Sequence, residues 1–351
     1  MSQYAMSPPP GAAPEAWMMQ LLSGFMASQY VHVAAKLGLA DLLRDGPRSA
    51  EELAAACGAD AKALFRLLRV LASIGVFEET GDGRFETTAL GAVLRTDHPS
   101  SLRAIAIFYG EELVWRAYGA LEHSVMTGQP AFENVFEKGF YDHVAGDARA
   151  ARAFGDAMGS FAALQTRQIV KEYDFGRFGR IMDVGGNEGA FLVELLRAYA
   201  GVHAVLLDTP HVIEAAALRL AQLAPDVRDR IELAAGDFLR EVPPGCDAYV
   251  LRNVLQDWND ERAHALLTRC RDAMSDRAAS LLVIGRLLEP GDERHPGKFT
   301  DMTMMVLTGG RERTTEEMRA LLAGAGLVVG SVTKTAAMVA VVEATVEGAR
   351  R

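Results

Sequence analysis

The chain has 351 residues, of which 50% are hydrophobic and 23% charged, as expected for a folded protein large enough for two domains. Its formal net charge of −10 argues against nucleic-acid binding, which needs basic surface to meet phosphates. Three cysteines without a C-x-x-C pair favour the cytoplasm and give no metal-site spacing. No signal peptide is evident, and no apolar run reaches the ~18 residues of a membrane span.

Residues 1–14 are rich in proline and alanine and are expected to form a disordered tail. Residues 15–103 are predicted to be a helical and winged-helix domain. Its first helix carries Trp17, Leu21, Phe25 and Met26 at helical spacing and is unusually apolar. Such a helix is either sunk in its own core or buried by a partner subunit. We favour the partner, because little chain precedes it to pack against.

Two helices and a hairpin follow, which is a winged-helix pattern. A Ser49/Glu52 capping box opens the first helix, Gly58 ends it and Asp60 caps the second. The hairpin turns at residues 81–83. Winged helices often bind DNA, but this wing carries four acidic residues that would repel phosphate: Glu78, Glu79, Asp82 and Glu86. We therefore interpret it as a structural and dimerising module.

The remaining chain divides into a helical part and an alternating part. Residues 104–177 are predicted to be connecting helices that line a substrate site, with a break at residues 128–130. From residue 178 to 346, strands alternate with helices, which predicts an α/β domain with a parallel, doubly wound sheet.

A glycine turn in the alternating part predicts a cofactor site. The strand Ile181–Val184 runs into Gly185, Gly186 and Gly189, and a helix follows directly. Such a turn lets the backbone approach a ligand at the helix N-terminus. Two further strands end near Asp208, placed to bind ribose hydroxyls, and near Asp237 and Phe238, placed to hold an adenine.

The acidic residues around this turn indicate which cofactor it binds. Asp183 precedes the glycines and Glu188 lies among them, and both carboxylates would oppose a pyrophosphate. They suit a ligand with an amine and a sulfonium. This favours S-adenosyl-L-methionine over a nicotinamide cofactor.

Several ordered motifs now carry a family resemblance: "MDVGGNEGAF", "LLDTPHVIEAA", the run from "AAGDFLREV" through "LRNVLQDWNDERA", and "MMVLTGGRERTTEEMRALLAGAGL". The chain resembles the caffeate/hydroxyindole type of S-adenosylmethionine-dependent O-methyltransferases, in their bacterial natural-product branch, near phenazine N-methyltransferase and anthracycline-tailoring members. The resemblance implies a Rossmann-like class I methyltransferase sheet with an N-terminal all-α and winged-helix domain. It also implies a homodimer formed through the N-terminal helices.

The resemblance assigns cofactor roles to the predicted site. Gly185, Gly186 and Gly189 would line the methionine portion, with Asp183 behind them. Asp208 would bind the ribose, and Asp237 with Phe238 the adenine. Arg252 stands where the family commonly has a lysine beside the cofactor. Asn187 replaces a usual glycine, a mild change because its backbone can still serve.

The family pattern breaks at the general base. Most members have a histidine before Asp257 and Trp258, whereas this chain has Gln256, which cannot take a proton near neutrality. An acidic residue that orients the histidine in the family aligns with Gly285, so both are lost together. Glu312 survives as the glutamate beside the acceptor. It is either a substrate-facing group or base, or a loop residue paired with Arg311 and Arg313.

The predicted function is methyl transfer from S-adenosyl-L-methionine to oxygen, nitrogen or carbon of a small aromatic or heterocyclic secondary metabolite, by proximity rather than by a histidine base. Alternatives are a non-methylating member such as a hydroxylase or pericyclase, a catalytically silent binder, and a winged-helix ligand-sensing regulator. His123, His143 and His295 are expected to be ordinary histidines rather than substitute bases. Gln256 would anchor the acceptor, in a pocket lined by Phe108, Met158, Phe161, Asp257, Met302 and Met305.

Overall fold

The computed structural model describes residues 11, 13–274, 279–292, 295–346 and 348. The tail predicted over residues 1–14 therefore lies almost wholly outside the described residues. The chain forms two compact units, one of residues 1–119 and 142–161 and one of residues 120–141 and 162–351. The predicted region of connecting helices is thus shared between the two units rather than separate.

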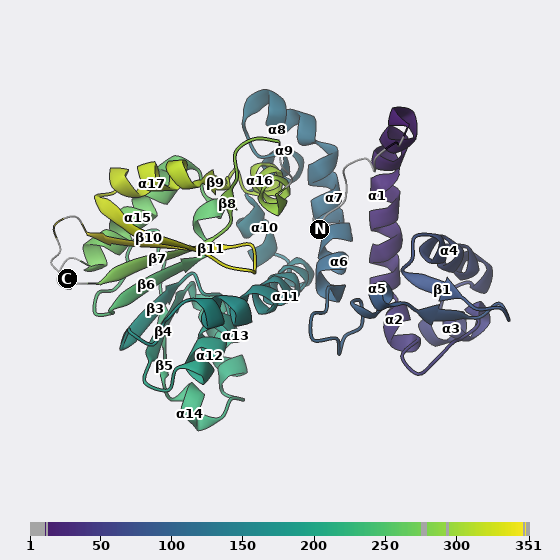
Figure 1. Ribbon diagram of the computed structural model, residues 1–351, viewed down its shortest axis with the longest axis horizontal. Helices are drawn as coiled ribbons and strands as arrows, with labels where there is room; N and C mark the ends of the chain where they lie inside the picture. The colour runs from purple at the N-terminus through teal and green to yellow at the C-terminus, as the bar shows by residue number, and fades with distance from the viewer. Residues whose placement is uncertain (1–10, 12, 275–278, 293–294, 347, 349–351) are drawn as a thin grey trace. The chain divides into compact units, whose positions relative to one another are not determined.

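The first unit is helical, with one small hairpin (Figure 1). It comprises α1 Pro14–Lys36, α2 Leu39–Leu42, α3 Ala50–Cys57, α4 Ala61–Ser73, β1 Phe77–Glu79, β2 Phe85–Thr87, α5 Ala89–Ala92, α6 Arg103–Gly110, α7 Glu112–Gly119, most of α10 Phe140–Ala145 and the first half of α11 Ala148–Glu172. The predicted helix, helix and wing are all present.

Local sequence signals set the boundaries of these helices as predicted. The Ser49 hydroxyl accepts from the Glu52 amide, and the Glu52 carboxylate accepts from the Ser49 amide, which completes the capping box of α3. Gly58 ends α3 in the left-handed conformation at φ 73°. The Asp60 carboxylate caps α4 by accepting from Ala63 N at 2.8 Å.

One face of α1 is apolar and exposed. Phe25 makes an edge-on contact with Trp115 of α7, yet most of its ring stays open. The exposed apolar side chains of α1 are Met18, Met19, Leu21, Leu22, Phe25, Met26 and Val33. The chain alone leaves this face uncovered, so the helix is not sunk in its own core, and a partner subunit is the remaining expectation.

The second unit is built on a seven-stranded sheet in the order β10-β11-β7-β6-β3-β4-β5. The strands are β3 Arg180–Val184, β4 His203–Asp208, β5 Ile231–Ala235, β6 Ala248–Arg252, β7 Ser280–Gly285, β10 Leu327–Lys334 and β11 Ala340–Val346. Five run parallel, while β11 is antiparallel to both of its neighbours. The doubly wound sheet is confirmed.

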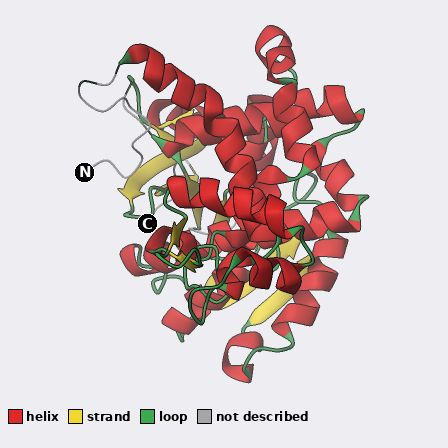
Figure 2. Cartoon of the chain, turned by 90° about the vertical axis from the view of Figure 1, so that its right-hand side faces the viewer, coloured by secondary structure: helices red, strands yellow, loops and turns green. Residues whose placement is uncertain are grey.

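Helices cover both faces of this sheet (Figure 1). α12 Ala190–Ala198, α13 Pro210–Leu220 and α14 Pro225–Arg228 pack on one face, together with the end of α11. α15 Asp260–Met274 and α17 Thr315–Gly324 pack on the other. Each face thus has its own apolar core. Figure 2 shows that helices make up most of the chain and surround the strands.

The remaining elements of the second unit are short and lie around its upper edge. They are α8 Leu121–Thr127, α9 Ala131–Phe136, the 3₁₀ turn η1 Leu255–Asp257, β8 Leu287–Leu288, α16 Pro296–Leu307 and β9 Arg313–Thr314. Gly128 ends α8 and Pro130 precedes α9, which confirms the predicted break. Among the described helices, none has the length and hydrophobicity needed to cross a bilayer.

Strand order determines where a ligand can bind. β6, β3, β4 and β5 are parallel neighbours, so their carboxyl ends meet at one edge of the sheet. In open α/β sheets, ligands bind outside the carboxyl ends of the strands. The glycine turn follows β3, Asp208 ends β4, and Arg252 ends β6, so the predicted cofactor residues gather there.

Candidate functional site

The turn after β3 is shaped by backbone conformations that favour glycine. Gly185 and Gly189 have φ of 74° and 75°, in the left-handed region. Gly186 is needed for space: a Cβ there would lie 2.4 Å from Oδ2 of Asp183 and 2.5 Å from Leu206. Asn187 also adopts φ 55°, and its amide donates to Asp208 Oδ2 at 2.9 Å, so its backbone adopts the left-handed turn and fixes the Asp208 carboxylate.

Asp183 lies directly behind this turn and is 1% exposed. Its Oδ1 has no hydrogen-bond partner. Burial raises the pKa of Asp183 to about 7, opposed by the positive charge of Arg252. An unpartnered buried carboxyl beside a glycine cradle fits the cationic amine of an amino-acid ligand.

Asp208 at the end of β4 is held by the backbone. Oδ1 accepts from Thr209 N at 2.7 Å, and Oδ2 accepts from Asn187 N. Burial raises its pKa, while these amide bonds lower it. Carboxylate oxygens have further lone pairs, so this fixed carboxylate can still accept from a ribose hydroxyl.

Glu188 does not share the role of Asp183. Its carboxylate pairs with Arg219 at 3.0 Å on the surface, so its charge is already compensated. The expectation that both acidic residues of the turn oppose a pyrophosphate therefore rests on Asp183 alone. Neighbouring positions in a turn can point to different sides, which the sequence does not resolve.

Asp237 and Phe238 follow β5 and differ in their surroundings. The ring of Phe238 packs on the core and lies 3.4 Å from where a Cβ of Gly185 would be, so it adjoins the glycine turn. Asp237 is exposed and pairs with Arg240 at 3.3 Å. Packing on the core thus fixes the position of the Phe238 ring. To bind a ligand, the Asp237 carboxylate would have to break its surface ion pair with Arg240.

Arg252 reaches from β6 toward the same edge. Its guanidinium donates to the Ala162 carbonyl at 3.0 Å and lies over the ring of Phe191, while Nε has no partner. Burial lowers the pKa of Arg252 to about 10, and Asp183 opposes that shift. The side chain therefore interacts electrostatically with Asp183, and its role beside the cofactor stays a prediction.

Gln256 lies on η1, just beyond β6. A Cβ built on Gly285 would be 3.4 Å from Oε1 of Gln256, so these two positions face each other as the paired substitutions suggested. The Gln256 side chain makes no hydrogen bond among the described residues. A cavity adjoins it, lined by apolar residues of the sheet and α17 and by five polar side chains: Gln256, Arg286, Arg311, Glu312 and Arg313.

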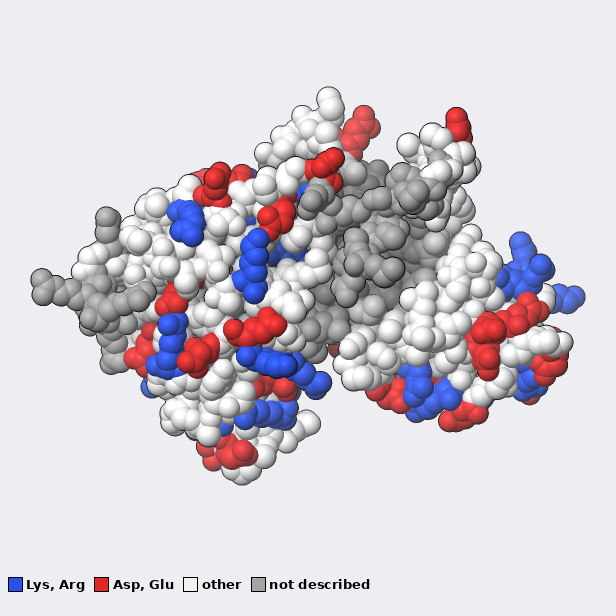
Figure 3. Space-filling view, in the orientation of Figure 1, with Lys and Arg blue, Asp and Glu red and all other residues white. Residues whose placement is uncertain are grey.

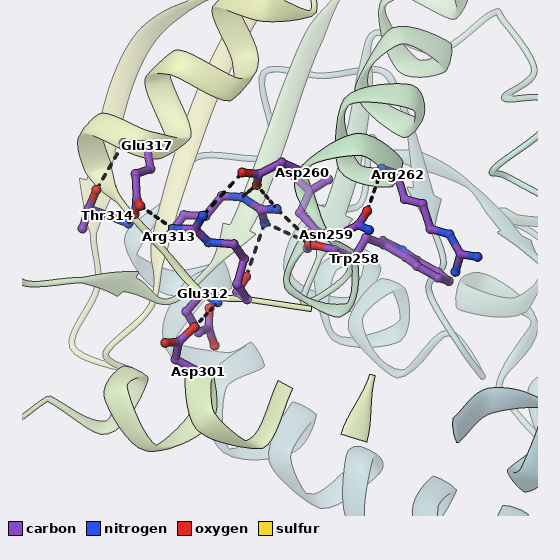
Figure 4. Close-up of polar contacts among 11 residues, drawn as sticks. Trp258, Asn259, Asp260, Arg262, Asp301, Glu312, Arg313, Thr314 and Glu317 are labelled. Atoms are coloured by element: carbon purple, nitrogen blue, oxygen red, sulfur yellow. Dashed lines mark hydrogen bonds and ion pairs between the residues drawn. The ribbon is translucent and has the colours of Figure 1, made fainter. Parts of the chain in front are cut away.

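Glu312 lies in this cavity wall and is 2% exposed. Its amide donates to Asp301 of α16 at 2.9 Å, but its Oε1 has no partner (Figure 4). Burial raises the pKa of Glu312 to about 8, opposed by Arg286. The alternative of a loop residue paired with its arginine neighbours is wrong, because both arginines bind other residues.

Those two arginines hold the loop around Glu312 in place. Arg313 donates to Asp260 at 2.7 Å and to the carbonyls of Leu255 and Trp258, each at 3.0 Å (Figure 4). Arg311 pairs with Asp260 and Glu317. Arg313 thereby ties β9 to η1, and this tie sets where Gln256 and Glu312 lie.

Asp257 has a partner that the sequence did not indicate. The hydroxyl of Tyr141 donates a hydrogen bond to its carboxylate, and the Tyr141 ring lies 6.0 Å from that of Trp258. Burial raises the pKa of Asp257 to about 7, and this hydrogen bond lowers it. Tyr141 is far away in the chain, and no local pattern marks it.

The other predicted pocket residues belong to different units. Phe108, Met158 and Phe161 are in the first, where Phe108 is buried against Phe154 and the Phe161 ring lies 6.2 Å from that of Tyr109. Met302 and Met305 are in the second, half-buried on α16, which packs against η1. Their roles toward an acceptor stay predictions.

His295 has a structural role. It caps α16, its Nδ1 accepting from Gly297 N at 3.2 Å, so its position is explained without catalysis. Across the described part of the chain, no group of three histidine, cysteine or acidic side chains could hold a metal ion. The face drawn in Figure 3 shows acidic and basic side chains interspersed.

This sheet order, with a glycine turn after its first strand and a carboxylate after its second, defines a methyltransferase that uses S-adenosyl-L-methionine. The family model of the O-methyltransferase domain matches residues 118–328, and that of the O-methyltransferase dimerisation domain matches residues 19–97. The chain belongs to this O-methyltransferase family, and the dimerisation domain makes it a homodimer.

Known proteins extend this relationship over the whole chain. A phenazine O-methyltransferase from Lysobacter antibioticus is 40% identical over 95% of this chain and 97% of its own. An 8-amino-8-demethylriboflavin N,N-dimethyltransferase from Streptomyces davaonensis is 39% identical, over 93% and 95%. The crystal structure of a neocarzinostatin-biosynthesis O-methyltransferase with S-adenosylmethionine and 2-hydroxy-5-methyl naphthoic acid has a TM-score of 0.78 and 33% identity, over 91% and 96%.

The relatives support methyl transfer over the non-methylating and regulatory alternatives. They are O- and N-methyltransferases by name, and solved relatives hold S-adenosylmethionine or S-adenosylhomocysteine. The cofactor is therefore S-adenosyl-L-methionine, and the resemblance noted in the sequence is confirmed.

Proposed function

We propose that this enzyme transfers a methyl group to an oxygen or nitrogen of a fused aromatic or heteroaromatic metabolite in the cytoplasm. The relatives support this acceptor class, because they are named for a phenazine and for a riboflavin amine. The cysteine usage supports the location, since all three cysteines are free.

The cofactor-binding residues follow from the buried edge of the sheet. Asp183 would hold the amine of the methionine portion, and Asp208 the ribose. Phe238 would cover the adenine, with Asp237 at its edge, and Gly185, Gly186 and Gly189 would line the path between them. The positive charge of Arg252 would balance the negative charge of Asp183. When bound, the sulfonium supplies an electrophilic methyl group.

The observation that carries the mechanism is the free amide of Gln256 at the edge of the cavity. Its side chain faces Gly285 rather than the carboxylate that orients a histidine base in the family, so this pair of positions cannot relay a proton. Gln256 would hold the acceptor by a hydrogen bond. This bond would aim the lone pair of the acceptor oxygen or nitrogen at the methyl carbon. Much of the barrier reduction then comes from orientation, which can supply about 7–11 kcal/mol.

The acceptor pocket would be completed by the apolar side chains predicted from the sequence. In the second unit these are Met302 and Met305, beside Asp257. Phe108, Met158 and Phe161 belong to the first unit, and their part in acceptor binding rests on the family resemblance alone. Methionines adapt to flat ring systems of different outline, which suits a branch of the family with varied aromatic substrates.

Methyl-labelled S-adenosyl-L-methionine tests the proposal. Incubation with hydroxy- and amino-substituted phenazines and flavins should transfer label to at least one ring system. If the protein binds the cofactor but labels none of them, the acceptor class is wrong.

Variants of Gln256 test its role on the labelled acceptor. Gln256→Leu removes one hydrogen bond and should raise KM about tenfold without changing the shape of the pH profile. Gln256→His should add a limb near pH ~6.5, the ordinary histidine pKa. Gln222→Leu, at an exposed position after α13, is the matched control. A pH limb that disappears in Gln256→Leu would contradict the anchoring role.

A further inference from the structure

Three arginines line the cavity beside Gln256, and they differ in whether the chain supplies a partner for their charge. Arg311 pairs with Asp260 and Glu317. Arg313 is 2% exposed and donates to Asp260 and to three backbone carbonyls. Arg286 has no hydrogen-bond or ion-pair partner among the described residues, and its Nε is buried.

The Arg286 side chain is half-buried, but its Nε is buried without a partner in the described structure, which is costly. Arginine stays protonated in proteins, so it cannot avoid the desolvation penalty by losing its charge. Leaving a buried donor unsatisfied costs about 1–3 kcal/mol, and more for a charged group. For Arg311 and Arg313, acidic side chains of the same chain form ion pairs that offset this cost. For Arg286 the missing partner has to come from the cavity.

Glu312 does not supply that partner. The two residues line the same cavity and interact electrostatically, but no ion pair forms between them. Burial raises the pKa of Glu312 to about 8, with Asp257 and Asp301 adding to the shift and Arg286 and Arg313 opposing it. Near pH 7 the carboxyl is therefore mostly protonated. In that form it donates a hydrogen bond and leaves the charge of Arg286 uncompensated.

Further titratable groups near Arg286 do not cancel its charge either. Burial lowers the pKa of His295, the N-cap of α16, and the positive charge of Arg286 adds to this shift, so the imidazole stays largely neutral near pH 7. Asp257 is buried and already accepts the hydroxyl of Tyr141. The cavity therefore combines one cation without an ion-pair partner in the described part of the chain, Arg286, with a carboxyl group and an amide that can both donate.

We propose that Arg286, with the Glu312 carboxyl and the Gln256 amide, forms an oxyanion site that binds the acceptor as an aromatic phenolate. This inference rests on the proposed function, since it specifies how the acceptor is held at that site. A guanidinium and two neutral donors match a single oxygen with full negative charge.

This site explains how methylation proceeds without a histidine base. The phenol loses its proton to solvent as it binds, because the cation of Arg286 favours the ionised form. The phenolate oxygen then forms the new bond to the methyl carbon, and the electron pair of the broken carbon–sulfur bond stays on sulfur. No side chain has to remove a proton during the transfer. The reaction is therefore compatible with Gln256, which cannot act as a base.

Absorbance spectroscopy with 1-hydroxyphenazine, a chromophore whose phenolate absorbs at longer wavelength than the phenol, tests the proposal. The full-length dimer, saturated with S-adenosylhomocysteine, is titrated with pH. In the wild type, the pKa of the bound phenol should fall by at least about one unit, which corresponds to tenfold tighter binding of the phenolate. Arg286→Met should abolish the shift and Arg286→Lys should keep part of it.

Arg319→Met is the matched control, because that arginine is exposed on α17 and does not line the cavity. It should keep the full shift. An unshifted or raised phenol pKa in the wild type, no spectral change on binding, or an equal shift in Arg286→Met would each overturn the proposal. Phenazine-1-carboxylate forms a second arm: if Arg286→Met weakens its binding while the phenol pKa does not shift, the cation serves a carboxylate and the phenolate site is wrong.

The spectral shift and the labelled methyl assay fail independently. A protein that methylates 1-hydroxyphenazine without shifting its pKa keeps the proposed function and loses the oxyanion site. A protein that shifts the pKa without transferring label keeps the site and shows that this ring system is not the acceptor.

Discussion

At the scale of single residues, the pKa of Glu312 makes the folded state sensitive to pH. Its pKa is raised from the ordinary 4.5 to about 8 by burial. Between these values the folded protein keeps a proton that the unfolded chain has lost. Stability from this group is therefore complete below pH ~4.5 and is lost as pH rises through about 8.

Glu312→Gln keeps the shape of the side chain and removes its titration. Relative to the wild type, the variant should gain about 4 kcal/mol in free energy of unfolding between pH 5 and pH 9, because the folded-state pKa lies about three units above pH 5 and each unit corresponds to about 1.4 kcal/mol. Urea unfolding at several pH values measures this. Asp183 and Asp257, with pKa values raised to about 7, should leave part of the slope in place.

Glu316→Gln, at an exposed position in the first turn of α17, is the control and should follow the wild-type curve. If Glu312→Gln is less stable than the wild type at pH 9, the carboxyl is already ionised and satisfied in the folded protein. The picture of a neutral, donating Glu312 would then be abandoned.

Individual site residues differ in how far the sequence could predict them. Gln256 and Gly285 could be paired because both depart from one family pattern, and the structure brings them face to face. Arg286 follows Gly285 directly, yet its meaning depends on which of three arginines lacks a partner. Tyr141 reaches Asp257 across more than a hundred residues. Such facts are set by packing, which leaves no periodic mark in the sequence.

At the scale of elements, the turn between β3 and α12 depends on space as much as on backbone conformation. Gly186 has no left-handed φ, so its glycine is required only because Asp183 and Leu206 fill the room a side chain would take. The sequence could predict a glycine turn here. It could not separate this steric requirement from the conformational one at Gly185 and Gly189.

Gly186→Ala should therefore displace Asp183 and weaken cofactor binding. A contact of 2.4 Å cannot be kept, and overpacking typically costs about 1–3 kcal/mol. We expect the Kd for S-adenosylhomocysteine to rise at least about tenfold, measured by calorimetry, with a lower Tm. Gly201→Ala, in open space between α12 and β4 and without left-handed φ, is the control. Equal cofactor affinity in both variants would show that Asp183 does not need its observed position.

Elements with local signals were the most predictable. The capping box of α3, the cap of α4, the break before α9 and the strand leading into the glycine turn are all encoded by neighbouring residues. The order of the seven strands is not, because β11 inserts antiparallel between β7 and β10. The resemblance predicted a class I methyltransferase sheet, which is confirmed, and the structure supplies the order of its strands.

At the scale of the whole molecule, the exposed apolar face of α1 is the feature that the single chain does not explain. Isolated exposed hydrophobic residues are ordinary, whereas several on one helix face mark a surface that another protein covers. The dimerisation domain begins in this helix, at residue 19. The prediction that a partner subunit buries α1 therefore follows from both sequence and exposure.

Charge introduced on this face should separate the subunits. Met19 and Leu22 are 61% and 60% exposed in the chain, so Met19→Asp with Leu22→Asp should leave the fold of each subunit intact. Burying two unpaired carboxylates at an interface is strongly unfavourable, and we expect the dimer Kd to rise at least about a hundredfold. Light scattering after size-exclusion chromatography measures the mass, and circular dichroism checks the fold. Leu218→Asp, on an isolated side chain of α13 that is 75% exposed, should remain dimeric. A double variant that stays dimeric at micromolar concentration would place the subunit interface elsewhere than on this face of α1.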